Sequence, residues 1–294
     1  MYLEHFGLRE YPFSTTPDPR FYYPSAKHRE ALACLLYAVE QRKGFALVSG
    51  EVGAGKSMLC RAAFDRFGED VDTALLVHTS LTAKQFFQAV CAKFGIAVKG
   101  KSKFELVRDI ENYLLDRSQM NRTAVLVVDE AQNLGRRVLE EVRLLGNLET
   151  ASDKLIQIVL VGQPELRTII GSPELRQLNQ RITIKFHLGT LSAEEVSEYI
   201  DHRLRVAGAN GDPIFDDAAK ARLFRASSGI PRVVNVLCDH ALLEAFVNDR
   251  RVVGEDAARG AIAELDGYYM DAQPEVHSAE RNALRSRGDL EERA

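Results

Sequence analysis

The chain has 294 residues, of which 46% are hydrophobic and 27% charged, an ordinary composition for one large or two modest globular domains. The formal net charge of −4 shows no overall basic excess, so composition does not indicate a nucleic-acid-binding protein, although a local basic patch is compatible with it. The first ten residues lack the apolar core of a signal peptide, and no run approaches the roughly 18 apolar residues of a membrane span. We therefore expect a cytoplasmic protein with no direct membrane span.

The four cysteines are far apart and form no CxxC pair, so they do not predict a metal site. They are Cys34, Cys60, Cys91 and Cys238. All four lie in apolar surroundings in the sequence, which predicts reduced thiols buried in the core.

Residues 1–25 form the first segment and are rich in proline and aromatic residues, as in YPFSTTPDPRFYYP. Each proline biases the preceding residue away from the helical region, so this segment is predicted to be ordered and extended. Two interpretations stay open: a strap that packs over the core, or a wall for a nucleotide base.

Residues 26–190 alternate short apolar runs with helical patterns. Strands are expected at 45–49, 74–79, 124–129, 156–162 and 182–188. Helical periodicity occupies 27–41, 56–67, 82–94, 103–118 and 135–148. Strands that are almost continuously apolar and are separated by helices predict an α/β fold with a parallel five-stranded sheet sandwiched between helices.

Residues 191–267 carry no strand signal and predict an all-helical domain. Its first helix begins at Ser192, which has Glu195 three residues later in the spacing of a capping box. Three further helical patterns follow, the second of them beginning at Pro231. Residues 268–294 are polar with mixed charges, which predicts a disordered tail.

The sequence GEVGAGKS, directly after the first expected strand, predicts a phosphate-binding loop. Glycines let successive backbone N–H groups converge on an anion, and the helix that follows adds its positive end. Lys56 is expected to reach the β- and γ-phosphates of ATP, and Ser57 to bind Mg²⁺. The expected nucleotide-binding residues are Gly50, Glu51, Val52, Gly53, Ala54, Gly55, Lys56, Ser57 and Met58.

A second motif, AVLVVDE, places two acids where an apolar strand ends. In open parallel sheets the loops at the carboxyl ends of the strands meet ligands. Asp129 is expected to hold Mg²⁺ through water, and Glu130 to polarise the attacking water. A carboxylate directly after the Mg²⁺ aspartate suits water as nucleophile, which favours hydrolysis over transfer to a substrate hydroxyl.

Four polar residues further along the chain are candidates for sensing the γ-phosphate. Gln163 follows the fourth expected strand and either contacts the γ-phosphate or caps the next helix. Arg181 precedes the fifth strand and either acts as an arginine finger on a neighbouring subunit or forms an ordinary ion pair, with Arg176 as the second candidate. Arg232 is also an expected nucleotide-binding residue, which would reach the nucleotide from the helical segment. It lies in the first turn of a helix, where its charge opposes the dipole, which indicates a ligand or an acidic partner.

In combination, these residues resemble the AAA+ ATPases and, within them, the ExeA or general secretion pathway protein A family. The resemblance covers residues 1–265 and is carried in order by these blocks: MYLEHFGLREYPFSTTPDPRFYYPSAKHREAL, GEVGAGKS, VLVVDEAQNL, LVGQPEL, LNQRI, LSAEEVSEYIDHRL and SGIPRVVNVLCDHAL. It implies a helical lid after the P-loop domain, sensor roles for Gln163 and Arg232, a finger at Arg181, and a ring or filament of identical chains.

The resemblance has one departure, because long members of the family continue into a membrane span and a periplasmic peptidoglycan-binding domain. This chain ends at Ala294, so we expect a short cytosolic form that serves secretion, pilus or export-machinery assembly. Two alternatives stay open. The first is a DNA-associated recruiter or loader, for which the basic cluster KGKSK at 99–103 is a candidate contact. The second is a nucleotide-bound scaffold with negligible turnover, against which the acidic pair Asp129–Glu130 argues.

Overall fold

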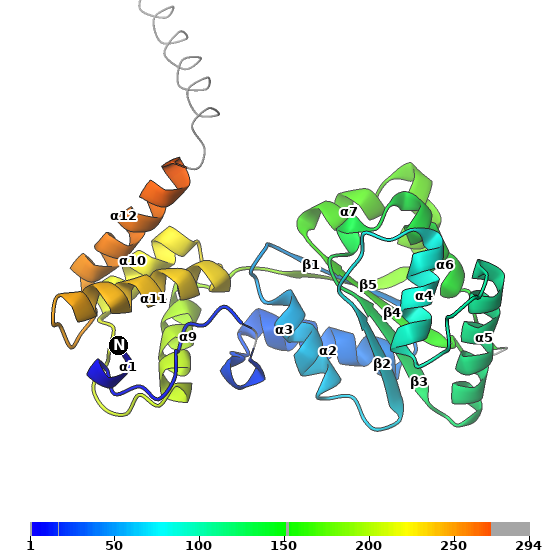
Figure 1. Cartoon of the computed structure of the whole chain (residues 1–294), viewed down its shortest axis with the longest axis horizontal. Helices are drawn as coiled ribbons and strands as arrows, with labels where there is room; N and C mark the ends of the chain where they lie inside the picture. The colour runs from blue at the N-terminus through cyan, green and yellow to red at the C-terminus, as the bar shows by residue number, and fades with distance from the viewer. Residues whose placement is uncertain (1, 17, 151–152, 272–294) are drawn as a thin grey trace, which may run out of the picture. The chain divides into compact units, whose positions relative to one another are not determined.

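A computed structural model describes residues 2–16, 18–150 and 153–271 of the chain (Figure 1). These residues form two compact units. The α/β unit contains residues 16–191 together with Ile230–Arg232. The helical unit contains residues 2–15, 192–229 and 233–271. Among the residues described, every helix is too short or too polar to cross a lipid bilayer.

The α/β unit is built on a five-stranded parallel sheet with the order β2-β3-β4-β1-β5, which confirms the predicted fold class. The strands are β1 (Phe45–Gly50), β2 (Val71–Leu76), β3 (Thr123–Val128), β4 (Ile156–Gly162) and β5 (Ile182–Leu188). Because all strands run the same way, the residues that follow β1, β3 and β4 meet at one edge of the sheet.

Helices cover both faces of the sheet (Figure 1). On one face, Ala46 and Val48 of β1 belong to a core shared with α2 (Ala26–Glu40) and α3 (Lys56–Phe64). On the other face, Phe45 and Leu47 belong to the larger core. Its helices are α4 (Ala83–Lys93), α5 (Lys103–Gln119), α6 (Arg136–Leu145), α7 (Pro164–Ile170) and α8 (Arg176–Arg181). Successive side chains of a strand point to opposite faces of the sheet, which explains this alternation along β1. Because helices cover both faces, both sets of residues are apolar.

Strand β2 differs from its prediction, because it spans Val71–Leu76 rather than 74–79. Its second residue is Asp72, whose charge hides the strand from a search for apolar runs. The structure pairs this carboxylate with the guanidinium of Arg122, which makes the charge compatible with a strand. Residues 77–79 lie in the loop after the strand, at the edge of the sheet where the candidate site lies.

The helical unit contains four long helices and the start of the chain. Its elements are α1 (Tyr2–His5), α9 (Ala193–Val206), α10 (Asp217–Ser227), α11 (Pro231–Val247) and α12 (Glu255–Asp271). Helix α9 begins with the predicted capping box, in which the Ser192 hydroxyl accepts a hydrogen bond from the N–H of Glu195. Helix α12 continues to Asp271, four residues past the predicted boundary at 267, and the rest of the predicted tail lies outside the described residues.

Residues 2–15 of the opening segment pack within the helical unit. The rings of Phe13 and Phe215 lie edge to face with their centroids 6.0 Å apart. The buried guanidinium of Arg203 donates through Nε to the carbonyl of Pro12 at 2.5 Å. Residues 2–15 are therefore a strap over the helical unit, and they include a short helix, α1, which the prediction of an extended segment missed. Residues 18–25 of the same predicted segment belong to the α/β unit and include a 3₁₀ turn at Pro19–Phe21.

The cysteines match their predicted environment at three of four positions. Cys60, Cys91 and Cys238 are buried, whereas Cys34 is only half-buried. Burial raises the pKa of the Cys91 thiol to about 11 and raises the pKa of the Cys238 thiol well above its usual value, so both remain protonated at neutral pH.

Candidate nucleotide-binding site

The loop after β1 is shaped by close contacts that exclude side chains. A Cβ on Gly50 would lie 2.6 Å from the carbonyl oxygen of Leu188, its partner on β5. Gly53 has a φ of +81°, and a Cβ there would lie 2.5 Å from the Cβ of Arg232. The glycines are therefore required because other backbone and side-chain atoms occupy the space beside the loop.

Gly55 ends the loop and precedes α3. Its φ is +97°, and a Cβ on it would lie 2.7 Å from Nε2 of His28, a buried histidine of α2. The other ring nitrogen of His28, Nδ1, is 2.8 Å from the hydroxyl of Ser25, which holds the ring in place. Because Gly55 has no side chain to cap α3, the N–H groups of the first turn are available to an anion.

Lys56 lies at the start of α3 with its ammonium turned back onto the loop. Nζ donates to the carbonyls of Gly50 at 2.8 Å and Glu51 at 3.0 Å. Burial lowers the pKa of Lys56, and the nearby carboxylates of Glu130 and Asp129 oppose that shift. The structure thus holds a cation among the loop carbonyls, at the position where the sequence predicts contact with the phosphates.

Ser57 and Asp129 form the candidate Mg²⁺ site. The Ser57 hydroxyl donates to Oδ2 of the buried Asp129 carboxylate at 2.7 Å, and Oδ1 of that carboxylate accepts from the N–H of Glu130 at 2.9 Å. A hydroxyl and a carboxylate are both oxygen donors, the ligand type that Mg²⁺ prefers. These two residues, which are 72 positions apart in the sequence, therefore fit the predicted ion.

Glu130 is the centre of a polar cluster. Its backbone is left-handed, with φ 50° and ψ 41°, a conformation that non-glycine residues adopt rarely and that is concentrated at functional sites. Its carboxylate oxygen Oε2 accepts from the amide of Gln163 at 3.3 Å and from the amide of Gln132. Its carbonyl accepts from the buried hydroxyl of Thr79 at 2.9 Å.

Gln132 and Thr79 are functional candidates that the sequence reasoning missed. Gln132 lies two residues after Glu130 in the block DEAQ, and Thr79 lies in the loop after β2, which the misplaced strand concealed. Gln163 precedes α7 but makes no side-chain capping hydrogen bond, so the geometry supports its contact with Glu130 rather than the alternative role as a helix cap.

Arg232 approaches the loop through its backbone and its side-chain stem. It is the second residue of α11, and its N–H donates to the carbonyl of Gly53 at 3.3 Å. Its Cδ would lie 3.4 Å from a Cβ on Gly53. The structure therefore brings this predicted site residue to the phosphate-binding loop.

Arg181 lies away from this edge of the sheet. Arg181 is the last residue of α8, directly before Ile182, which pairs with Phe45 at the amino end of β1. The loop follows the carboxyl end of β1, and five residue steps along a strand cover about 16 Å. The pKa of Glu149 is lowered mainly by Lys154 and, to a smaller extent, by the positive charge of Arg181, so Arg181 lies near that carboxylate. Arg181 therefore does not join the other site residues within one chain, and Arg176 is exposed at the start of α8.

Two comparisons of sequence place the chain among known proteins. Residues 39–170 match the model of the AAA domain. The chain is 42% identical over 263 residues to General secretion pathway protein A of Aeromonas hydrophila. That alignment covers 89% of this chain and 48% of the relative, so the chain spans about half the length of the relative.

Solved structures share the fold at lower identity. The ORC2 protein of Aeropyrum pernix, solved in ADPNP–ADP complexes, has a TM-score of 0.66 at 17% identity, covering 86% of this chain and 71% of that one. Drosophila ORC bound to DNA has a TM-score of 0.61 at 21% identity, covering 86% of this chain and 64% of that one. The matched AAA domain and the 42% identity over 89% of this chain show an AAA-type P-loop protein related to general secretion pathway protein A, and the solved structures show that the fold is shared.

Proposed function

We propose that the protein hydrolyses ATP in a Mg²⁺-dependent reaction that switches an assembly of identical chains. The observation that carries the proposal is the meeting of four groups at one edge of the sheet: the Lys56 ammonium, the Ser57 hydroxyl, and the Asp129 and Glu130 carboxylates. Their residue types and order match the parts needed for phosphoryl transfer to water.

Each group has a role that follows from its chemistry. The backbone of residues 50–57 and the first turn of α3 bind the phosphates, and Lys56 adds positive charge. Ser57 and Asp129 would hold Mg²⁺, which would supply positive charge to the phosphate oxygens. The Glu130 carboxylate accepts a proton from the attacking water, and the Gln163 amide orients that water.

The position of Arg181 supports an assembly. Because it lies at the opposite edge of the sheet from the loop, it is suited to reach the site of a second copy, with exposed Arg176 as the second candidate. A positive charge supplied in this way makes hydrolysis depend on contact between chains. We propose a ring or filament on this ground.

Replacing the proposed base tests the activity. Glu130→Gln keeps the size of the side chain but removes the proton acceptor, so phosphate release should fall at least about 100-fold while Mg²⁺–ATP still binds. Glu111→Gln, an exposed change of the same type on α5, is the control and should leave the rate unchanged. Hydrolysis by the Glu130 variant at the wild-type rate would show that another group is the base. The scaffold alternative predicts negligible phosphate release from the wild-type protein as well.

We propose that the protein uses cytoplasmic ATP to support the assembly of a secretion, pilus or export machine. Its support is the 42% identity to a protein named for general secretion. Crosslinking in cells compares the Glu130→Gln variant with a double variant that also carries Lys56→Ala, which prevents ATP binding. Components of the machine should be recovered with the single variant and not with the double variant. Recovery of the same proteins from both variants would contradict a nucleotide-controlled partner.

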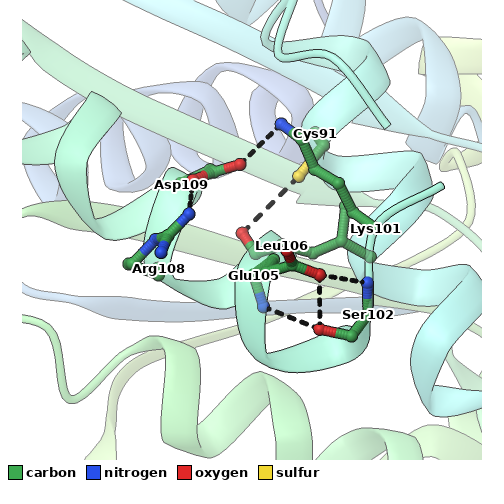
Figure 2. Close-up of polar contacts among 7 residues, drawn as sticks. All are labelled: Cys91, Lys101, Ser102, Glu105, Leu106, Arg108 and Asp109. Carbon is green, nitrogen blue, oxygen red and sulfur yellow. Dashed lines mark hydrogen bonds and ion pairs between the residues drawn. The ribbon is translucent and has the colours of Figure 1, made fainter. Parts of the chain in front are cut away.

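The alternative of DNA binding is weakened by the structure of its candidate contact. Figure 2 shows that Lys101 forms an ion pair with Asp109, at 2.6 Å, beside the capping box that Ser102 and Glu105 make at the start of α5. Lys103 forms an ion pair with Glu141. Two of the three lysines in KGKSK are thus partly neutralised, so we expect no duplex binding that weakens steeply with added salt in fluorescence anisotropy.

A further inference from the structure

We propose that Gln132 is a positioning residue for hydrolysis, which fixes the Glu130 carboxylate relative to Gln163. This inference rests on the proposed function and adds a residue to it. The amide of Gln132 lies between the ends of two neighbouring strands, β3 and β4, and is bonded at both of its ends. Its role is to orient the group that accepts the proton.

The contacts form a closed ring of three residues. Nε2 of Gln132 donates to Oε2 of Glu130, and Oε1 of Gln132 accepts from the backbone N–H of Gln163 at 3.1 Å. Nε2 of Gln163 then donates to the same Oε2 of Glu130 at 3.3 Å. Because a backbone N–H can only donate, this ring determines which end of the Gln132 amide faces Glu130.

The surrounding backbone is shaped for this amide. The half-buried Gln132 belongs to a 3₁₀ turn, Ala131–Asn133, which the left-handed residue Glu130 starts. The last residue of β4 is Gly162, and a Cβ there would lie 2.5 Å from Oε1 of Gln132. A glycine at this position therefore leaves the space that the amide oxygen occupies.

The ring has a direct consequence for the chemistry. Both amides donate to Oε2, so the carboxylate is held by one oxygen, and the second oxygen, Oε1, is the one placed to accept the proton of water. A glutamate side chain without such support samples several rotamers, and a displacement of about 1 Å in a reacting group costs about 100-fold in rate. Gln132 reduces that freedom through its hydrogen bonds to Glu130 and Gln163.

The test compares ATP binding and turnover in Gln132→Met, which keeps the length of the side chain and removes both hydrogen bonds. We expect the kcat for phosphate release to fall about 10- to 100-fold, while the Kd of Mg²⁺–ATP changes less than about twofold. Gln119→Met, at the exposed end of α5, is the matched control and should behave as wild type. Gln132→Asn, whose shorter amide does not span both partners, provides the same test if the methionine variant does not fold.

A double-mutant cycle separates positioning from general damage. In the Glu130→Gln background the base is absent, so adding Gln132→Met should change the residual rate less than about twofold. A further loss of 10-fold or more in that background would overturn the inference, because it would show that Gln132 acts elsewhere. If Glu130→Gln is inactive and Gln132→Met turns over at the wild-type rate, the inference fails while the proposed function stands. If Glu130→Gln itself is fully active, the proposed function fails.

Discussion

At the scale of single residues, the loop works because its glycines leave room for other parts of the chain. Gly53→Ala combines a positive φ with a contact of 2.5 Å to the Cβ of Arg232, which is not the flexible end of that side chain. The loop must therefore shift, and we expect the affinity for Mg²⁺–ATP in calorimetry to fall at least about 10-fold.

Gly95→Ala is the matched control for this change. Gly95 has a similar φ of +75°, but a Cβ on it would have no neighbour within 4 Å. It should lose about 1 kcal/mol of stability and bind ATP as the wild type does. Equal loss of ATP binding in both variants would show that strain alone, and not the contact beside the loop, controls the site.

At the scale of elements, strand β2 depends on a charged pair that is sensitive to pH. The hydrogen bond from Arg122 to Asp72 is the largest cause that lowers the pKa of this carboxyl. A carboxyl with a lowered pKa stabilises the folded chain above its unfolded pKa of about 4, and the stabilisation is lost as the pH falls through the folded value.

Asp72→Asn should therefore reduce stability by about 1 kcal/mol near pH 7, a value discounted for partial exposure. The difference from wild type should shrink as the pH falls below about 4. Urea unfolding across this range, followed by circular dichroism, measures it. A difference that stays constant with pH would mean that the carboxyl is not stabilised by Arg122.

The same strand illustrates what the sequence can predict about the elements. Strands β4 and β5 were predicted at their observed bounds because their apolar residues are continuous or regularly spaced. Strand β2 was placed three residues late because Asp72 is explained by its partners Arg122 and Arg117, which lie far away in the sequence. Patterns that depend on near neighbours are visible in a sequence, and pairs that depend on the fold are not.

The candidate site divides in the same way. Lys56, Ser57, Asp129 and Glu130 were predicted because their motifs are local, and the structure brings them together. Gln132 was not singled out, since its importance arises only when the ends of β3 and β4 lie side by side.

At the scale of the whole molecule, the chain passes more than once between its two units. The strap of residues 2–15 belongs to the helical unit, whereas Ile230–Arg232 belong to the α/β unit although α11 continues into the helical one. Arg232 is thus at once a contact of the phosphate-binding loop and the start of a long helix.

Complementation between two inactive variants tests the central claim most directly, because it requires both the base at Glu130 and an arginine from another copy. Glu130→Gln and Arg181→Ala should each release phosphate at least about 100-fold more slowly than wild type. In an equal mixture that has exchanged subunits, about a quarter of the sites pair an intact base with an intact arginine, so about a quarter of the wild-type rate should return. Wild-type hydrolysis by either variant alone, or no recovery in the mixture, would contradict the account.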